Sequence, residues 1–212
     1  MARTEPFDRY LNEYEEWFTE HKYVYESELE AVSHLIPKNK KGIEIGIGTG
    51  RFAIPFGIRE GVEPSSVMRH FAMYKGLEVY EGIAEELPLA NESYDFALMV
   101  TTICFVDNIE KSFSEVRRIL KPGGCFIVGF VDINSPLGRL YEKMKSENKF
   151  YNCATFYSTD EVIKYLKDSH FFIMNIIQTV FGNLDKINEV QKFKNWYGYG
   201  GFVVIKTKKV VD

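Results

Sequence analysis

The feature that most constrains this chain is a short apolar strand that runs directly into a loop with glycine at every second position. Residues 43–50 read Ile-Glu-Ile-Gly-Ile-Gly-Thr-Gly. Glycine lacks a Cβ atom, so such a loop can turn sharply and its backbone can approach a ligand closely. A second apolar stretch ends on Glu63, whose carboxylate is well placed to accept hydrogen bonds from the two hydroxyls of a ribose. Together these features indicate a binding site for a nucleoside-containing cofactor.

The spacing of the glycines departs from the pattern of a dinucleotide-binding loop. That pattern, Gly-x-Gly-x-x-Gly, requires its third glycine at the position that holds Arg51. Glu63 also follows the loop sooner than the roughly 20 residues typical of a dinucleotide site. Both departures weaken the interpretation of the loop as an NAD site without excluding it.

Beyond the glycine loop, short apolar stretches alternate with amphipathic helical patterns, which is typical of βαβ units and a parallel sheet. Seven strands are predicted, at residues 42–46, 61–63, 77–81, 95–100, 125–131, 171–180 and 201–207. Helices are predicted within 7–36 and over 65–74. Two more are expected after Asp107 or Asn108, either of which can cap a helix, and after Ser158, which opens the capping-box sequence Ser-Thr-Asp-Glu.

Composition narrows the class of partner. The 212 residues carry a net charge of -4, so the chain lacks the excess of basic residues that is typical of a nucleic-acid-binding protein. No segment reaches the roughly 18 apolar residues that span a bilayer, and the first 20 residues are too charged for a secretory signal. The three cysteines show no metal-type spacing. We therefore expect a cytoplasmic protein with no metal site, no membrane span and no nucleic-acid partner.

Four motifs in order make the chain resemble the class I S-adenosylmethionine (AdoMet)-dependent methyltransferases. They are Glu-x-Gly-x-Gly-x-Gly at 44–50 with Glu63, Gly-Ile-Ala-Glu-Glu-Leu-Pro at 82–88, Ser-Tyr-Asp-Phe at 93–96 and Ile-Leu-Lys-Pro-Gly-Gly at 119–124. The chain is most similar to the small-molecule branch that includes the ubiquinone/menaquinone C-methyltransferases. The resemblance covers residues 41 to 131.

The resemblance implies an α/β, Rossmann-like fold. The expected sheet is mostly parallel and seven-stranded, with an antiparallel last strand, helices on both faces and a helical N-terminal cap. Residues 1–212 would form a single methyltransferase domain. Within it, 1–40 would be the cap, 41–131 the AdoMet-binding core, and 132–212 a lid segment followed by the C-terminal strands.

The resemblance also implies which residues bind AdoMet. They are Glu44, Gly46, Gly48, Gly50, Glu63, Ala84, Glu85 and Thr101. The glycines would lie beside the methionine part of AdoMet, and Glu44 would reach its amino group through water. Glu63 would bind the ribose, although it also fits as an acid at the start of the next helix. Ala84 and Glu85 would contact adenine, but Ile83 stands where many relatives have Asp, so Glu85 also fits as a solvated loop acid.

The acceptor side is less sharply defined. Its expected pocket residues are Tyr10, Tyr14, Trp17, Thr102 and Phe105, although aromatic residues at this helical spacing also suit core packing. A sulfonium methyl group is already activated, so catalysis requires mainly proximity and orientation, and no catalytic residue is obligatory. For an amine or phenol acceptor, His21 and His70 are the candidate bases, but a lone helical histidine is more often a surface or packing residue.

The sequence therefore predicts an AdoMet-dependent methyltransferase acting on a small molecule, with N, O and C acceptor atoms and the oligomeric state all open. One alternative is an NAD(P)-binding oxidoreductase, because Tyr141 and Lys145 have Tyr-x-x-x-Lys spacing. The other is a non-catalytic AdoMet-binding domain that kept the fold.

Overall fold

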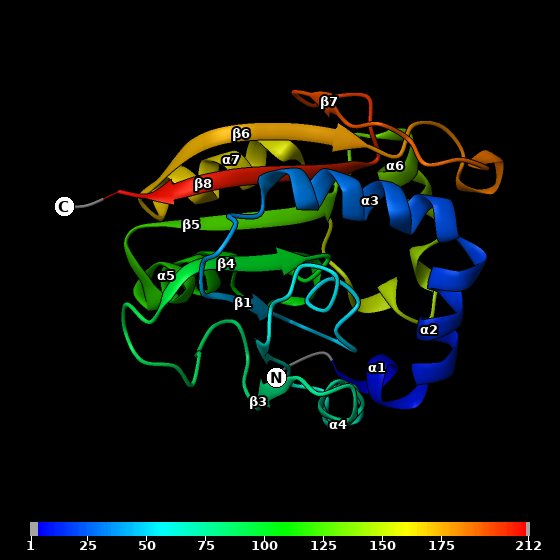
Figure 1. The fold of residues 1–212 in the computed structure, drawn as a ribbon. Helices are drawn as coiled ribbons and strands as arrows, with labels where there is room; N and C mark the ends of the chain where they lie inside the picture. Colours follow the sequence, from blue (N-terminus) through cyan, green and yellow to red (C-terminus); the bar gives the residue numbers. More distant parts are fainter. Residues whose placement is uncertain (1–3, 211–212) are drawn as a thin grey trace.

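The structure is a computed structural model that describes residues 4–210, and its framework is a mixed eight-stranded sheet. The strands are β1 (Gly42–Ile45), β2 (Glu60–Val62), β3 (Glu78–Tyr80), β4 (Tyr94–Val100), β5 (Leu120–Val131), β6 (Phe171–Thr179), β7 (Lys194–Asn195) and β8 (Phe202–Lys209). Their order across the sheet is β3-β2-β1-β4-β5-β8-β6-β7 (Figure 1). The seven predicted strands are all present, and β7 is an additional two-residue strand that pairs with β6.

The strands β1 to β5 run parallel, whereas β8 is antiparallel to both β5 and β6. The predicted antiparallel last strand is therefore confirmed. The fifth strand begins earlier than predicted, because Leu120 already pairs with Tyr94 before the register shifts. Since the chain returns from β3 to the other side of β1, the order of strands reverses between β1 and β4. Ligands of open α/β sheets bind at such a reversal.

The helices account for the amphipathic stretches of the sequence. They are α1 (Glu5–Arg9), α2 (Leu11–Glu20), α3 (Lys22–Leu35), α4 (Ser66–Tyr74), α5 (Ile109–Ile119), α6 (Pro136–Lys143) and α7 (Thr159–Asp168), with 3-10 turns η1 (Ile103–Phe105), η2 (Lys145–Glu147), η3 (Tyr151–Cys153) and η4 (Leu184–Lys186). Asn108 caps α5 by accepting a hydrogen bond from the Lys111 amide at 2.8 Å. Ser158 and Glu161 form the predicted capping box of α7. Local polar side chains thus set these helix starts.

Two buried clusters cover the two faces of the sheet. Side chains alternate along β4, so Ala97 and Met99 pack with α5 and α7, whereas Phe96, Leu98 and Val100 pack with α3. The α5/α7 cluster contains Phe113, Val116, Val162 and Leu166, and the α3 cluster contains Val24, Ala31, Val32 and Leu35. Truncating a buried ring such as Phe113 to alanine costs about 3–5 kcal/mol. The sheet is therefore a rigid platform for the loops at its strand ends.

The helices α1 and α2 lie beyond the carboxyl ends of β1 and β4, whereas α3 runs across the face of the sheet (Figure 1). Two polar anchors hold them there. Asp8 of α1 accepts a hydrogen bond from the Ser65 hydroxyl at 2.7 Å. Glu15 of α2 accepts hydrogen bonds from the Thr49 hydroxyl and the Arg51 guanidinium, both in the loop after β1. The predicted helical cap is therefore tied directly to the glycine loop.

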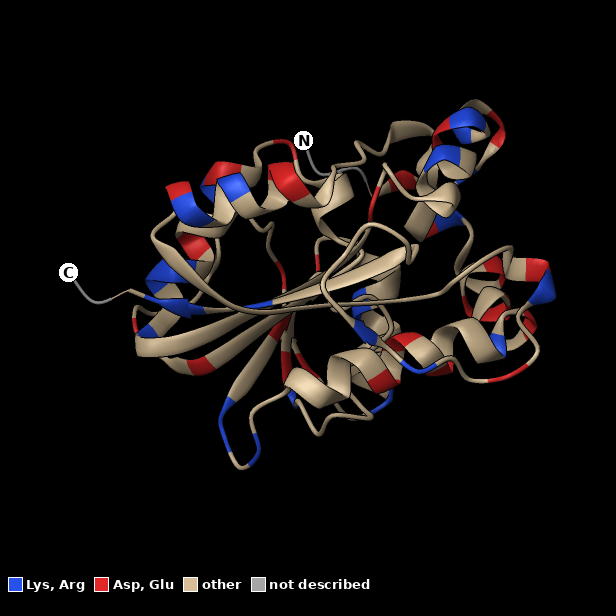
Figure 2. Ribbon diagram, turned by 90° about the horizontal axis from the view of Figure 1, so that it is seen from above, with Lys and Arg blue, Asp and Glu red and all other residues tan. Residues whose placement is uncertain are grey.

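The surface carries charges of both signs. Figure 2 shows acidic and basic residues interspersed on the helices that surround the sheet. Across residues 4–210, every helix is too short or too polar to cross a lipid bilayer.

Candidate active site

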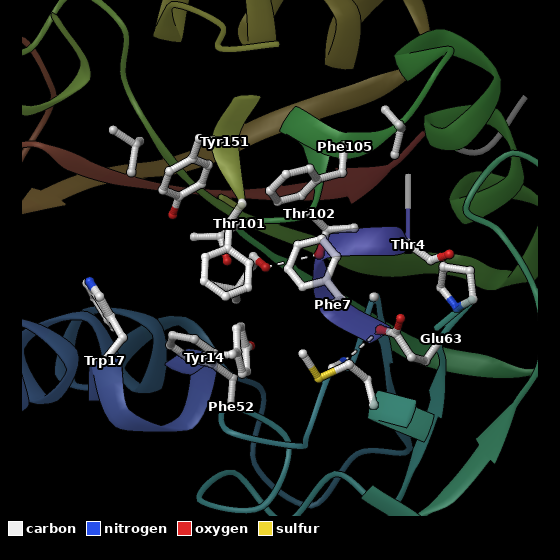
Figure 3. Close-up of a pocket in the computed structure, with 18 of the residues that line it drawn as sticks. Thr4, Phe7, Tyr14, Trp17, Phe52, Glu63, Thr101, Thr102, Phe105 and Tyr151 are labelled. Atoms are coloured by element: carbon white, nitrogen blue, oxygen red, sulfur yellow. Dashed lines mark hydrogen bonds between the residues drawn. The ribbon is translucent and has the colours of Figure 1, made fainter. Parts of the chain in front are cut away.

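A cavity of about 570 Å³ lies at the carboxyl ends of the parallel strands, where the strand order reverses (Figure 3). Its volume is within the roughly 300–1,000 Å³ typical of small-molecule sites. The loops after β1, β2, β3 and β4 line one part of it, and α1, α2, α3, α6 and residues 147–151 line most of the rest. One cavity thus joins the glycine loop to an aromatic chamber, which distant segments form with Trp17, Phe105, Tyr141, Phe150 and Tyr151.

Two of the three predicted glycines form the cavity wall. Gly46 has a φ of 70° and Gly48 a φ of 54°, in the left-handed region that favours glycine. A Cβ atom on Gly46 would lie 2.5 Å from the Thr102 side chain, so only glycine allows this close approach. Gly50 does not line the cavity, because it faces Leu77 and serves the turn itself.

Glu63 lies at the cavity wall with its carboxylate held by two backbone amides. Oε2 accepts a hydrogen bond from the Gly48 amide at 2.8 Å, and Oε1 accepts one from the Ser65 amide at 2.9 Å. Ser65 in turn caps α4, so Glu63 is also tied to that helix start. Burial raises the pKa of Glu63 to about 7. A carboxylate has about four lone-pair sites, so two remain for vicinal hydroxyls, as a ribose requires.

Glu44 lies behind the glycine loop rather than on the cavity wall. It is 1% exposed, and its Oε2 has no hydrogen-bond partner within the described chain. Burial raises its pKa well above the usual range. The side chain therefore supports the loop from beneath, with one buried oxygen unsatisfied.

The loop after β3 contributes Ala84 and Glu85 to the cavity. Glu85 Oε1 accepts hydrogen bonds from the amides of Asp107 at 2.6 Å and Asn108 at 3.1 Å, at the start of α5. The carboxylate therefore couples the β3 loop to α5. Glu85 is not the freely solvated loop acid that the sequence also allowed, because it is buried.

Thr101 and Thr102 follow β4 and lie at the centre of the cavity (Figure 3). Thr101 has a φ of 50°, which is an outlier for a β-branched residue, and its amide donates to the Gly129 carbonyl at 2.8 Å. Such strain costs about 1–3 kcal/mol and concentrates at functional sites. The sequence contains no signal for this strain.

Most of the predicted acceptor-side residues line the cavity. Tyr14, Trp17, Thr102 and Phe105 do so. Tyr10 does not, because α1 ends at Arg9 and breaks the helical phase, so Tyr10 packs against Phe150 and Lys149 instead. Phe7, on α1, takes its place, with its ring centroid 5.0 Å from that of Phe105.

The two candidate bases lie in different environments. His21 lines the cavity, and its ring stacks on Trp17 with a centroid distance of 4.9 Å. His70 is exposed on α4, where Nδ1 lies 2.7 Å from the Ser66 carbonyl oxygen, and it does not line the cavity. Its position excludes contact with a ligand in the cavity.

Sequence reasoning missed several residues of the aromatic chamber, including Glu28, Tyr141, Phe150 and Tyr151. Glu28 had a readable signal. It falls between Val24 and Val32 at intervals of four on the buried face of α3, where an acid is unexpected. Tyr141, which the sequence offered only for the oxidoreductase alternative, lies on α6, and Phe150 and Tyr151 follow in an irregular stretch; no local pattern in either segment indicates a cavity.

Comparison with known proteins places this geometry in a family. A model of the methyltransferase domain family matches residues 43–128. A solved structure from Thermotoga maritima is that of a SAM-dependent methyltransferase, described as a possible histamine N-methyltransferase. Its sequence is 49% identical to this chain, and the two structures superpose with a TM-score of 0.94 over 97% of this chain and 98% of that one. The chain is a member of the SAM-dependent methyltransferase family.

Two further relatives show how far the family likeness extends. An uncharacterized protein of Methanocaldococcus jannaschii is 44% identical over 96% of this methyltransferase and 98% of its own length. The ubiquinone/menaquinone biosynthesis C-methyltransferase of Brucella canis is 39% identical, but over only 36% of this chain and 31% of its own. The likeness to the latter is therefore distant and confined to part of the chain, although the motifs had suggested that branch as the most similar one.

The oxidoreductase alternative is inconsistent with both the family and the geometry. The helix α6 ends at Lys143, so Tyr141 and Lys145 do not share a helix. Tyr141 lines the cavity, but Lys145 does not, and its Nζ lies 3.9 Å from Glu142. The methyltransferase therefore lacks the Tyr-Lys pair on one helix face that a hydride-transfer site of that type requires.

Proposed function

We propose that this methyltransferase transfers the methyl group of AdoMet to a small molecule held in the aromatic chamber of the cavity. The observation that carries the proposal is the continuity of the cavity. It runs from Glu63, the expected ribose ligand, past Thr101 and Phe105 to Trp17 and Tyr151, within one volume of about 570 Å³ (Figure 3). A small acceptor fits this volume better than a macromolecule does.

The residues around the glycine loop suit AdoMet. Gly46 and Gly48 leave room for its methionine part, and Glu63 retains lone pairs for the ribose. Ala84 and Glu85 line the part of the cavity expected to hold adenine. When bound there, AdoMet supplies a methyl group that its sulfonium already activates.

The remaining task of the chain is to orient the acceptor and to exclude water. Fixed geometry of this kind lowers a barrier by roughly 7–11 kcal/mol in favourable cases. The ring of Phe7 makes T-shaped contacts with the rings of Tyr14 and Phe105, and these three rings would help to keep water from bound molecules. We therefore propose that proximity and orientation provide most of the rate enhancement, without an obligatory catalytic base.

We further propose that the N-terminal cap and segment 132–157 close over the bound molecules as two parts of one domain. Two contacts support this. Lys149 Nζ lies 3.4 Å from the Glu13 carboxylate of α2, and the rings of Phe7 and Phe150 approach to 5.7 Å. Both contacts join the two segments beside the cavity.

The first experiment is calorimetric titration of the purified protein with AdoMet, S-adenosylhomocysteine and NADH in parallel. Micromolar binding of the first two without NADH supports the proposed cofactor half. The variant Gly48→Arg should abolish that binding, because a side chain there enters the cavity and meets the Tyr14 hydroxyl.

A methyl-transfer assay with labelled AdoMet then tests the acceptor half. The description of the Thermotoga relative makes amines the first class to test, with phenols and quinols beside them. Cofactor binding without turnover on any of these acceptors would instead favour the non-catalytic alternative.

A further inference from the structure

A buried carboxyl group without a partner faces the aromatic chamber. Glu28 of α3 is 5% exposed and lines the cavity. Burial alone shifts its pKa, and the described chain supplies it with neither a hydrogen bond nor an ion pair. A buried carboxyl without such a partner is costly, so a molecule that brings a hydrogen-bond donor to this point of the cavity would bind favourably.

Aromatic rings lie close to this carboxyl. Burial contributes most to the raised pKa of the Tyr141 and Tyr151 hydroxyls, and the charge of Glu28 raises both pKa values further, so both hydroxyls lie within its electrostatic reach. The rings of these two tyrosines stack with a centroid distance of 5.0 Å, and Tyr151 stacks on Phe105 at 6.0 Å. A row of rings thus leads from the end of β4 to Glu28.

Glu28 lies away from the cofactor half of the cavity. The helix α3 packs against β5, β6 and β8, whereas Glu63 follows β2 on the other side of β1. No charged group contributes to the pKa shift of Glu28, so its carboxyl is not part of the Glu63 network. It therefore belongs to the acceptor side.

The chemistry of this set favours a cation. An ammonium group offers three N–H donors to a carboxylate, and aromatic faces attract cations through their quadrupole. A neutral alcohol or phenol would satisfy the carboxyl by one hydrogen bond and gain nothing from its charge. We propose that Glu28, with the rings of Tyr141 and Tyr151, binds a protonated amino group of the methyl acceptor, a role that rests on the proposed methyl-transfer function.

The protonation state of Glu28 gives the proposal a second readout. Burial raises the pKa of this carboxyl to about 8, so it is mostly protonated at neutral pH in the free protein. The other titratable groups within its electrostatic reach are Tyr25 of α3, Tyr141 of α6 and Tyr151 of η3, which are all neutral there. Binding of an ammonium group therefore releases close to one proton from Glu28 to the solvent near pH 7.

The test is titration of the S-adenosylhomocysteine-saturated protein with 2-phenylethylamine and with its uncharged analogue 2-phenylethanol. We expect the amine to bind about tenfold or more tightly than the alcohol, as a charge-assisted hydrogen bond allows. Buffers of different ionisation enthalpy should reveal the released proton. Glu28→Gln should lose both the preference and the proton release while its affinity for S-adenosylhomocysteine stays unchanged.

Glu30→Gln is the matched control, because Glu30 is exposed on the same helix and should bind like the wild type. Equal affinity for amine and alcohol, no amine binding, or a preference that survives in Glu28→Gln would each overturn the inference. If S-adenosylhomocysteine itself fails to bind, the proposed function is wrong instead, and titration of the unliganded protein still tests the amine preference.

Discussion

Replacing Glu28 by glutamine should remove a loss of stability that the wild-type protein suffers as the pH rises. The pKa of Glu28 is about 8 in the folded protein and 4.5 in its ordinary state. A carboxyl whose folded pKa is raised favours the folded state while it is protonated. That contribution is fully present below about pH 4.5 and is lost as the pH rises through 8.

The size of the effect follows from these two values. They differ by about 3.5 pH units, and each unit corresponds to about 1.4 kcal/mol. The total loss is thus of the order of 5 kcal/mol, of which roughly 3 kcal/mol is lost by pH 7. Whole domains are stable by only about 5–15 kcal/mol, so the effect is large enough to measure.

The assay is urea unfolding of wild type, Glu28→Gln and the exposed control Glu30→Gln at a series of pH values from about 5 to 9. The difference in free energy of unfolding between Glu28→Gln and wild type should widen by about 4 kcal/mol over this range. Other buried acids such as Glu63 titrate in both proteins and cancel in the difference. Parallel curves for wild type and Glu28→Gln would refute the reasoning.

Three further predictions concern the cofactor half. Gly46→Ala should weaken AdoMet binding by about tenfold or more in calorimetry, because its Cβ would meet Thr102, whereas Gly57→Ala, with a similar φ and open space around it, should leave affinity near wild type. Glu63→Gln should weaken AdoMet binding by about tenfold or more. The affinity of the wild type for AdoMet should decrease as the pH is lowered through about 7, where Glu63 becomes protonated, whereas the affinity of the variant should not change with pH. Glu15→Gln should loosen the cap and speed dissociation of S-adenosylhomocysteine by about threefold or more in stopped-flow measurements, and an unchanged rate would argue against cap opening as the exit step.

The fold and the cofactor loop could be predicted because their signals are local. The alternation of strands and helices, the caps at Asn108 and Ser158, and the glycine pattern each lie within a few neighbouring residues. The one acceptor-side residue that was placed wrongly, Tyr10, also has a local cause. Tyr10 falls at a helix junction, which shifts its side chain away from the phase that the spacing predicts, and Phe7 takes its place.

The sequence by itself predicted a parallel α/β fold with a cofactor loop, because strand, turn and helix preferences are properties of short segments. The resemblance to methyltransferases depended on four short motifs in order. Only the tertiary structure decided what surrounds the acceptor. Glu28 and Tyr141 are more than 100 residues apart, yet both line one cavity, because the sheet brings α3 and α6 to its carboxyl edge. The strain at Thr101 and the missing partner of Glu28 likewise depend on packing between distant segments, which no local pattern records.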